Sequence, residues 1–107
     1  MKKYILLCIF FLGAVFSPLS LGAAPVGSCH APGLMCTNFI SGYTAEQARA
    51  ACVRHNMFTF SLKACPRSNR VGVCTVQKGG KTLESIYYAN AERAERSCRA
   101  LKGSFRR

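Results

Sequence analysis

The six cysteines between positions 29 and 98 limit what this chain can fold into more than any other feature. They are Cys29, Cys36, Cys52, Cys65, Cys74 and Cys98. An even number of cysteines in a short chain that leaves the cytosol predicts three disulfides, with fifteen pairings to choose from. A chain of this size buries a marginal apolar core, and each disulfide adds about 2 to 4 kcal/mol to its stability. We therefore expect the disulfides to make the fold viable.

The N-terminal segment predicts export. Two lysines precede an apolar run at residues 4–16, and small residues follow up to Ala24. This is the layout of a secretory signal peptide, so residues 1–23, with Cys8 among them, are expected to be removed. No second apolar run follows, so we expect a mature chain without a transmembrane segment, acting in the periplasm or outside the cell.

Lipid anchoring at Cys29 is the alternative to a free exported protein. The stretch VGSC, residues 26–29, loosely matches a lipid-attachment motif. Pro25 does not suit that motif, and lipidation would leave an odd number of cysteines for pairing. We therefore favour the free protein.

The charge of the chain predicts an anionic partner. Once residues 1–23 are removed, thirteen Lys and Arg remain against four Glu, with no Asp, a formal charge of +9. Such a surplus attracts anionic surfaces and acidic proteins. The candidate anion-binding residues lie in turns, away from acidic residues: Arg67, Arg70, Lys78 and Lys81. Further unmatched cations end the chain: Lys102, Arg106 and Arg107.

Specific recognition of a nucleic acid is not expected. It usually requires basic residues interleaved with exposed aromatic side chains. Tyr87 and Tyr88 are the adjacent aromatics nearest to the basic residues, and we expect one of them to lie in the core.

Helical periodicity and capping signals predict two helices. Thr44 with Gln47 three residues later forms a capping box, and a helix is expected over 45–55. Asn90 caps a second helix that ends near residue 103. Residues 24–35 are expected to form a Pro/Gly-rich lead-in, which a bond between Cys29 and Cys36 could close into a small loop. Residues 36–107 are expected to form the disulfide-stabilised domain. Strands are expected at 36–40, 57–64, 71–76 and 83–88.

Much of the charge on the second helix is expected to be matched within the helix. Glu92 precedes Arg96 by four residues, and Glu95 precedes Arg99 by four. This spacing and order favour ion pairs on a helix surface.

The two predicted helices resemble each other. AEQARAAC at 45–52 and AERAERSC at 91–98 share Ala, Glu, Ala and Cys at equivalent positions. An extended segment that starts with Cys-Thr, at 36 and at 74, precedes each helix. We interpret this as a degenerate duplication of a strand-helix-strand unit whose second copy is shortened at the C-terminus. The disulfides that we expect to tie each helix end to a strand are Cys52–Cys65 and Cys74–Cys98.

The stretch CPRSNRVGVCT, residues 65–75, follows a helix that ends in a cysteine. In this it resembles small exported bacterial cysteine-rich proteins of unassigned function with a C-P-x5-G-x-C-T signature. The resemblance covers about residues 36–105. It implies a disulfide-linked α+β module and assigns no activity to any residue.

Residues suited to catalysis or metal binding are few. The lack of Asp excludes a Ser-His-Asp triad, and the lack of a C-x-x-C motif excludes haem attachment and the usual thiol oxidoreductase site. The enzyme hypothesis that survives is a ribonuclease-like acid/base pair of His30 and His55, with Lys63 holding the phosphate. We expect no metal or other cofactor, because the cysteines pair off completely.

These features together predict a monomeric, small, disulfide-rich α+β domain with two helices packed on a short antiparallel sheet. The expected function is non-catalytic, an exported cationic module that binds an anionic partner at the envelope or outside the cell. The alternatives are a secreted ribonuclease-like hydrolase and a cationic toxin or antimicrobial protein.

Overall fold

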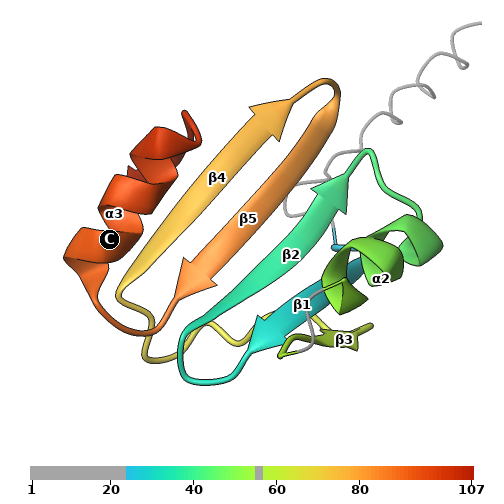
Figure 1. Cartoon of the computed structure of the whole chain (residues 1–107), viewed down its shortest axis with the longest axis horizontal. Helices are drawn as coiled ribbons and strands as arrows, with labels where there is room; N and C mark the ends of the chain where they lie inside the picture. The colour runs from blue at the N-terminus through green and yellow to red at the C-terminus, as the bar shows by residue number, and fades with distance from the viewer. Residues whose placement is uncertain (1–23, 55–56) are drawn as a thin grey trace, which may run out of the picture.

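The computed structural model describes residues 24–54 and 57–107, which form six strands and two helices (Figure 1). In chain order these are β1 (Gly27–Ala31), β2 (Met35–Ser41), α2 (Ala45–Val53), β3 (Thr59–Ser61), β4 (Gly72–Lys78), β5 (Lys81–Tyr87), α3 (Ala91–Ala100) and β6 (Ser104–Arg106). The strands form one antiparallel sheet in the order β3-β1-β2-β5-β4-β6. The predicted disulfide-rich α+β fold is confirmed. The predicted signal peptide, residues 1–23, lies outside the described residues.

The sheet consists of two equivalent halves. Each half is a hairpin, then a helix, then a three-residue strand that returns to pair with the first strand of its hairpin. The halves meet where β2 pairs with β5, and there Thr37 lies opposite Ser85 with their hydroxyl oxygens 2.8 Å apart. A pseudo-twofold axis therefore passes through the Thr37–Ser85 pair and relates the two ββαβ units.

The strand register shows which residues are equivalent. Cys29 lies opposite Thr37 and Phe60, whereas Cys74 lies opposite Ser85 and Phe105. Cys29 and Cys74 are thus equivalent. The predicted alignment of Cys36 with Cys74 is wrong, and the second unit is complete because β6 supplies its last strand.

Two of the three disulfides found in the described residues obey this symmetry. Cys29–Cys52 and Cys74–Cys98 each join the first strand of a half to its helix, and the second of them confirms a predicted pair. The predicted Cys52–Cys65 pair is wrong, because Cys65 bonds to Cys36. The predicted loop closed between Cys29 and Cys36 is wrong for the same reason.

The wrong disulfide predictions arise from β1, which the sequence does not mark by alternation. This strand lies within the segment 24–35 that was predicted to be a lead-in, and it places Cys29 beneath α2. The strand predicted over 57–64 is shorter than expected, with residues 59–61 in the sheet. After residue 61 the chain leaves the sheet edge.

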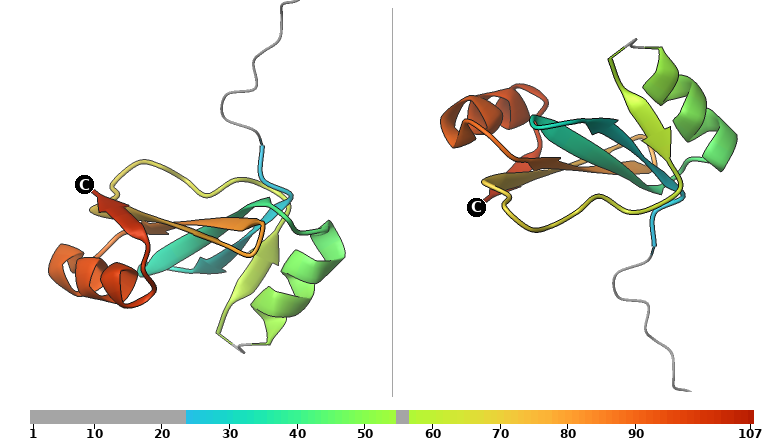
Figure 2. Two further views of the ribbon diagram at one scale, coloured as in Figure 1. Left: turned by 90° about the horizontal axis from the view of Figure 1, so that it is seen from above. Right: turned by 90° about the horizontal axis from the view of Figure 1, so that it is seen from below.

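Both helices pack on one face of the sheet, and the segment 62–71 crosses the other face (Figure 2). We call residues 62–71 the crossing segment. Because side chains alternate along a strand, Cys29 and Cys74 point toward the helices, whereas Cys36 and Ile86 point toward the crossing segment. The core is divided accordingly into a cluster around Phe39 under α2 and a cluster around Ile86 under the crossing segment.

A glycine next to a phenylalanine ring recurs in both halves. A Cβ atom built on Gly27 would lie 2.4 Å from Cζ of Phe60, and one built on Gly72 would lie 2.2 Å from Cζ of Phe105. These distances are far below van der Waals contact. Each phenylalanine therefore occupies space that a side chain on the first strand would need.

We predict that Gly72→Ala lowers the free energy of unfolding by about 1 to 3 kcal/mol, because the Phe105 ring must move. Adding Phe105→Leu should recover part of this loss. Urea denaturation of the wild type, the two single variants and the double variant measures the coupling between the two positions. The cycle of Gly27→Ala with Phe60→Leu is the matched test in the other half. Purely additive effects in both cycles would contradict the packing described here.

Candidate anion-binding face

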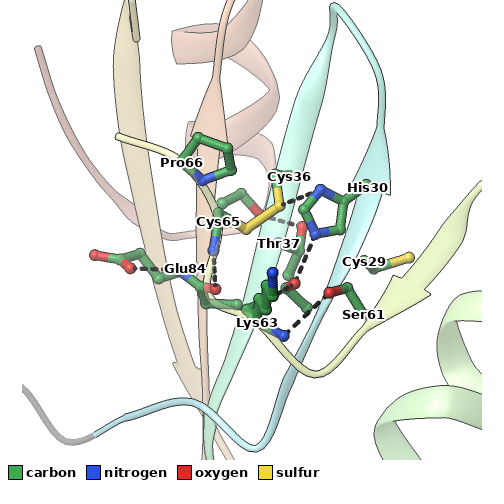
Figure 3. Close-up of a disulfide and its surroundings, with 12 residues drawn as sticks. Cys29, His30, Cys36, Thr37, Ser61, Lys63, Cys65, Pro66 and Glu84 are labelled. Carbon is green, nitrogen blue, oxygen red and sulfur yellow. Dashed lines mark hydrogen bonds between the residues drawn. A yellow bond between two sulfur atoms is a disulfide. The ribbon is translucent and has the colours of Figure 1, made fainter. Parts of the chain in front are cut away.

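The crossing segment is fixed to the sheet at its middle (Figure 3). The Cys36–Cys65 disulfide bonds it to β2, and the Cys65 N–H donates a hydrogen bond of 2.9 Å to Oδ1 of Asn38. The hydroxyl of Tyr88 donates to the carbonyl of Pro66 at 2.5 Å. One covalent bond and two hydrogen bonds thus hold the backbone of neighbouring residues, so the side chains that follow start from a fixed position.

Glu84 on β5 binds two arginines on this face. Its side chain is 13% exposed, and its Oε1 lies 2.6 Å from Nη2 of Arg67 while its Oε2 lies 3.6 Å from Nη2 of Arg106. The Asn38 amide also donates to Oε1, at 3.1 Å, which orients the carboxylate. One carboxylate therefore positions two guanidinium groups, and a net positive charge remains.

Arg70 adds a third guanidinium to the group. Its Nη1 donates a hydrogen bond of 3.1 Å to the carbonyl oxygen of Arg67. We call Arg67, Arg70 and Arg106 the arginine cluster. The side chains of Arg67 and Arg106 are 51% and 60% exposed, so N–H groups remain accessible to a ligand. The planar guanidinium fork suits carboxylate, phosphate and sulfate oxygens.

Lys78 and Lys81, the other two predicted anion-binding residues, lie on the opposite face. They face each other across the β4–β5 hairpin, whose Gly79 and Gly80 have φ of 60° and 78°, values that this tight turn requires. Alternation from Cys74 places both lysines on the helix side, and Nζ of Lys81 lies 5.2 Å from the centre of the Tyr43 ring. The four predicted residues therefore form two separate pairs.

The sequence did not predict that Arg106 would join Arg67. The prediction that Arg67, Arg106 and Arg107 are unmatched cations is wrong, because the first two bind Glu84 and the third binds Glu95. Arg106 reaches Glu84 because β6 pairs with β4. The contact depends on a strand of three residues, for which no alternation is visible in the sequence.

Charge on α3 is matched in part, as expected. Glu95 lies 2.6 Å from Arg99, which confirms that predicted pair, and 3.3 Å from Arg107. The ion pairs of the described residues do not include the predicted pair of Glu92 with Arg96. Glu95 thus repeats the arrangement at Glu84, one carboxylate between two arginines, but at the helix surface.

The residues of the enzyme hypothesis lie in part on the face of the crossing segment (Figure 3). Nε2 of His30 lies 2.7 Å from Oγ of Ser28, and Nδ1 lies 3.4 Å from Sγ of Cys36. The Ser28 hydroxyl donates to the carbonyl oxygen of Lys63, so His30 and the Lys63 backbone are close. His55 lies outside the described residues. Both ring nitrogens of His30 therefore already have polar partners within the fold.

Tyr87 and Tyr88 point to opposite faces of the sheet. Tyr87 lies on the helix side, opposite Met35 and Gly72, whereas the Tyr88 hydroxyl reaches the crossing segment. Burial raises the pKa of Tyr87. Burial also raises the pKa of Tyr88, and the positive charge of Arg67 partly offsets that rise. The two rings thus form no common surface on which nucleic-acid bases could stack.

Within 24–54 and 57–107, no group of three or more His, Cys, Asp or Glu side chains is placed to hold a metal ion. In the same ranges no helix has the length and apolar character needed to cross a membrane.

Comparison with protein-family models, with curated proteins and with solved structures finds no significant match to this chain.

We predict that Glu84→Gln lowers the free energy of unfolding by about 1 to 2 kcal/mol, because two guanidinium groups lose their charged partner. Glutamine can still accept the hydrogen bond from Asn38. High salt should reduce the loss, since it screens the repulsion among the arginines. Glu92→Gln on α3 is the control and should cost no more than about 0.5 kcal/mol. If Glu84→Gln and Glu92→Gln lower the free energy of unfolding equally in urea denaturation, Glu84 has no special role in stability.

Proposed function

We propose that this protein is an exported, non-catalytic binding module whose arginine cluster holds an anionic partner at the cell envelope or outside the cell. The observation that supports this proposal is the arrangement at Glu84. A mostly buried carboxylate holds two exposed guanidinium groups side by side. The partner is an anionic surface or an acidic protein with closely spaced phosphate, sulfate or carboxylate groups.

The arrangement favours binding because the arginines are ordered before a ligand arrives. A free arginine side chain loses about 2 kcal/mol of rotamer entropy when it is fixed. Here Glu84 and the carbonyl oxygen of Arg67 restrict the guanidinium groups in the free protein. Less entropy is then lost on binding, and the surplus charge of the cluster remains for the ligand.

The overall charge acts at longer range. The thirteen Lys and Arg against four Glu in residues 24–107 attract a polyanion to the molecule before any contact forms. This attraction falls with salt over the Debye length, whereas direct guanidinium contacts are screened less. Attraction by net charge and binding at the arginine cluster therefore differ in how strongly they depend on salt.

Two observations support release as a free exported protein. Three disulfides in the described residues suit an oxidising compartment, and residues 1–23 have the composition of a signal peptide. Cys29 is bonded to Cys52, so lipid attachment at Cys29 would remove one of the two symmetric disulfides.

We predict that the double variant Arg67→Gln/Arg106→Gln binds heparin, a sulfated polyanion, about tenfold or more weakly than the wild type at physiological salt. The matched control is Lys78→Gln/Lys81→Gln, which removes the same charge from the opposite face and should weaken binding about threefold or less. Isothermal titration calorimetry measures both affinities. Vesicles of phosphatidylglycerol, with phosphatidylcholine vesicles as the neutral reference, test whether an anionic lipid surface binds in the same way.

Equal losses in the two double variants would overturn the proposed site, because they would show that net charge alone controls binding. Weaker heparin binding in the lysine variant alone would show that the anion-binding site lies on the helix face. Enzyme activity is a separate readout, and cleavage of RNA that disappears in His30→Ala would contradict the non-catalytic assignment.

We predict that the protein expressed with its own leader is exported and has an intact mass that starts near residue 24. Alkylation should add six groups, and only after reduction, because every cysteine from 29 to 98 is in a disulfide. Mass spectrometry before and after reduction measures both. A mass that starts at Cys29 with acyl chains attached would contradict the free form.

A further inference from the structure

The two halves differ in how the helix covers its hairpin. In the first half Tyr43, two residues before α2, packs edge-on against Phe39 with ring centres 5.0 Å apart. Tyr43, Ala51 and Leu83 are among the partly buried residues that pack against the buried cluster of Phe39 and Ala48. An aromatic side chain from the strand-to-helix connection therefore packs over the core of this half.

The pseudo-twofold axis identifies the equivalent positions in the second half. Phe39 and Tyr87 each lie two residues after the axis pair Thr37–Ser85, and Tyr43 and Ala89 each lie two residues before the first residue of a helix. The residues equivalent to Phe39, Tyr43, Leu83, Ala48 and Ala51 are Tyr87, Ala89, Met35, Ala94 and Ser97. The connection from Tyr87 to α3 is two residues shorter than that from Phe39 to α2, so Ala89 matches Tyr43 by its distance from the helix start. At this position the second half has a methyl group and the first half a tyrosine ring.

A cavity of about 400 Å³, open to solvent, lies beside Ala89. All five of the equivalent residues line it, together with Leu34, Asn90 and Arg93. The volume falls within the range of small-molecule sites, which are mostly apolar with few polar groups. A smaller cavity of about 260 Å³ lies beside Tyr43 and Leu83 in the first half. The two units therefore differ in the size and the lining of this space.

Arg93 gives this cavity a positive charge at its edge. The equivalent residue in the first half is Gln47, whose side chain completes the capping box with Thr44. In the second half Asn90 caps the helix by itself, by accepting a hydrogen bond of 3.2 Å from the Arg93 N–H. The Arg93 side chain is exposed and belongs to none of the ion pairs of the described residues.

We propose that this cavity binds a small apolar anion, an aromatic or branched aliphatic body with one carboxylate or sulfonate group. The apolar body takes the space that Tyr43 fills in the first half and is buried against Met35 and Ala94. Its anionic group pairs with Arg93 at the helix surface. Burial of the apolar body supplies affinity, and the charge selects anions over neutral compounds.

This site is independent of the proposed function, because it lies on the helix face and shares no residue with the arginine cluster. The cavity site and the arginine cluster can therefore be disproved separately. Loss of the cavity should leave heparin binding unchanged, and Arg67→Gln/Arg106→Gln should leave the cavity unchanged.

The test uses 8-anilinonaphthalene-1-sulfonate, an apolar anion whose fluorescence rises in an apolar site. Ala89→Tyr restores the side chain of the closed half and should weaken probe binding at least about tenfold without loss of thermal stability. Ala89→Leu is a smaller second variant with the same expected direction. Arg93→Gln, which introduces the residue of the other half, should weaken binding about five- to tenfold, and Arg96→Gln on the same helix is the charge-matched control.

Nuclear magnetic resonance locates the probe directly. The methyl signals of Met35, Ala89 and Ala94 should shift on titration, whereas those of Val53 on α2 should not. Probe affinity unchanged in both Ala89 variants, or shifts outside this set, would overturn the site. Equal effects of Arg93→Gln and Arg96→Gln would overturn the preference for an anion.

Discussion

The pairing of β2 with β5 is the interaction on which the rest of the structure depends. Each ββαβ unit leaves the second strand of its hairpin with a free edge, and unpaired edges are exposed to association with other chains. Antiparallel pairing about Thr37 and Ser85 covers both edges at once. The same register sets Asn38 opposite Glu84 on one face and Met35 opposite Tyr87 on the other, so it determines the neighbours in both proposed sites.

The crossing segment is where the symmetry ends, since it joins one unit to the next and has no counterpart. It is fastened at two equivalent positions by different means. Cys36 bonds it covalently through Cys65, and Glu84, the equivalent of Cys36, binds it through Arg67. An ion pair at a partly exposed position adds little stability compared with a disulfide. The main consequence of Glu84 is therefore an ordered set of arginines rather than a stable connection.

The sequence predicted local structure better than contacts between distant segments. Capping residues and the repeated Ala and Cys positions predicted both helices, because these signals lie within one helix. The pairing of Cys29 with Cys52 was missed because it depends on β1, a five-residue strand with a Gly, a His and no alternation. The arginine cluster was half predicted, since Arg67 and Arg70 are neighbours in sequence, whereas Arg106 depends on the pairing of β6 with β4.

The residues that form the cavity under α3 differ visibly from their counterparts in the sequence. The difference can be recognised only once the two units are correctly aligned. Alignment through Cys36 and Cys74 sets the wrong strands against each other, whereas the two helices, matched at Cys52 and Cys98, set Tyr43 against Ala89 and Gln47 against Arg93. Divergence of a duplicated core commonly replaces one large apolar residue by another, which keeps the packing. Here the large residue is replaced by alanine and the nearby neutral residue by arginine. A loss of volume beside a gain of charge favours a ligand at this site, whereas in the first half Tyr43 packs over the core.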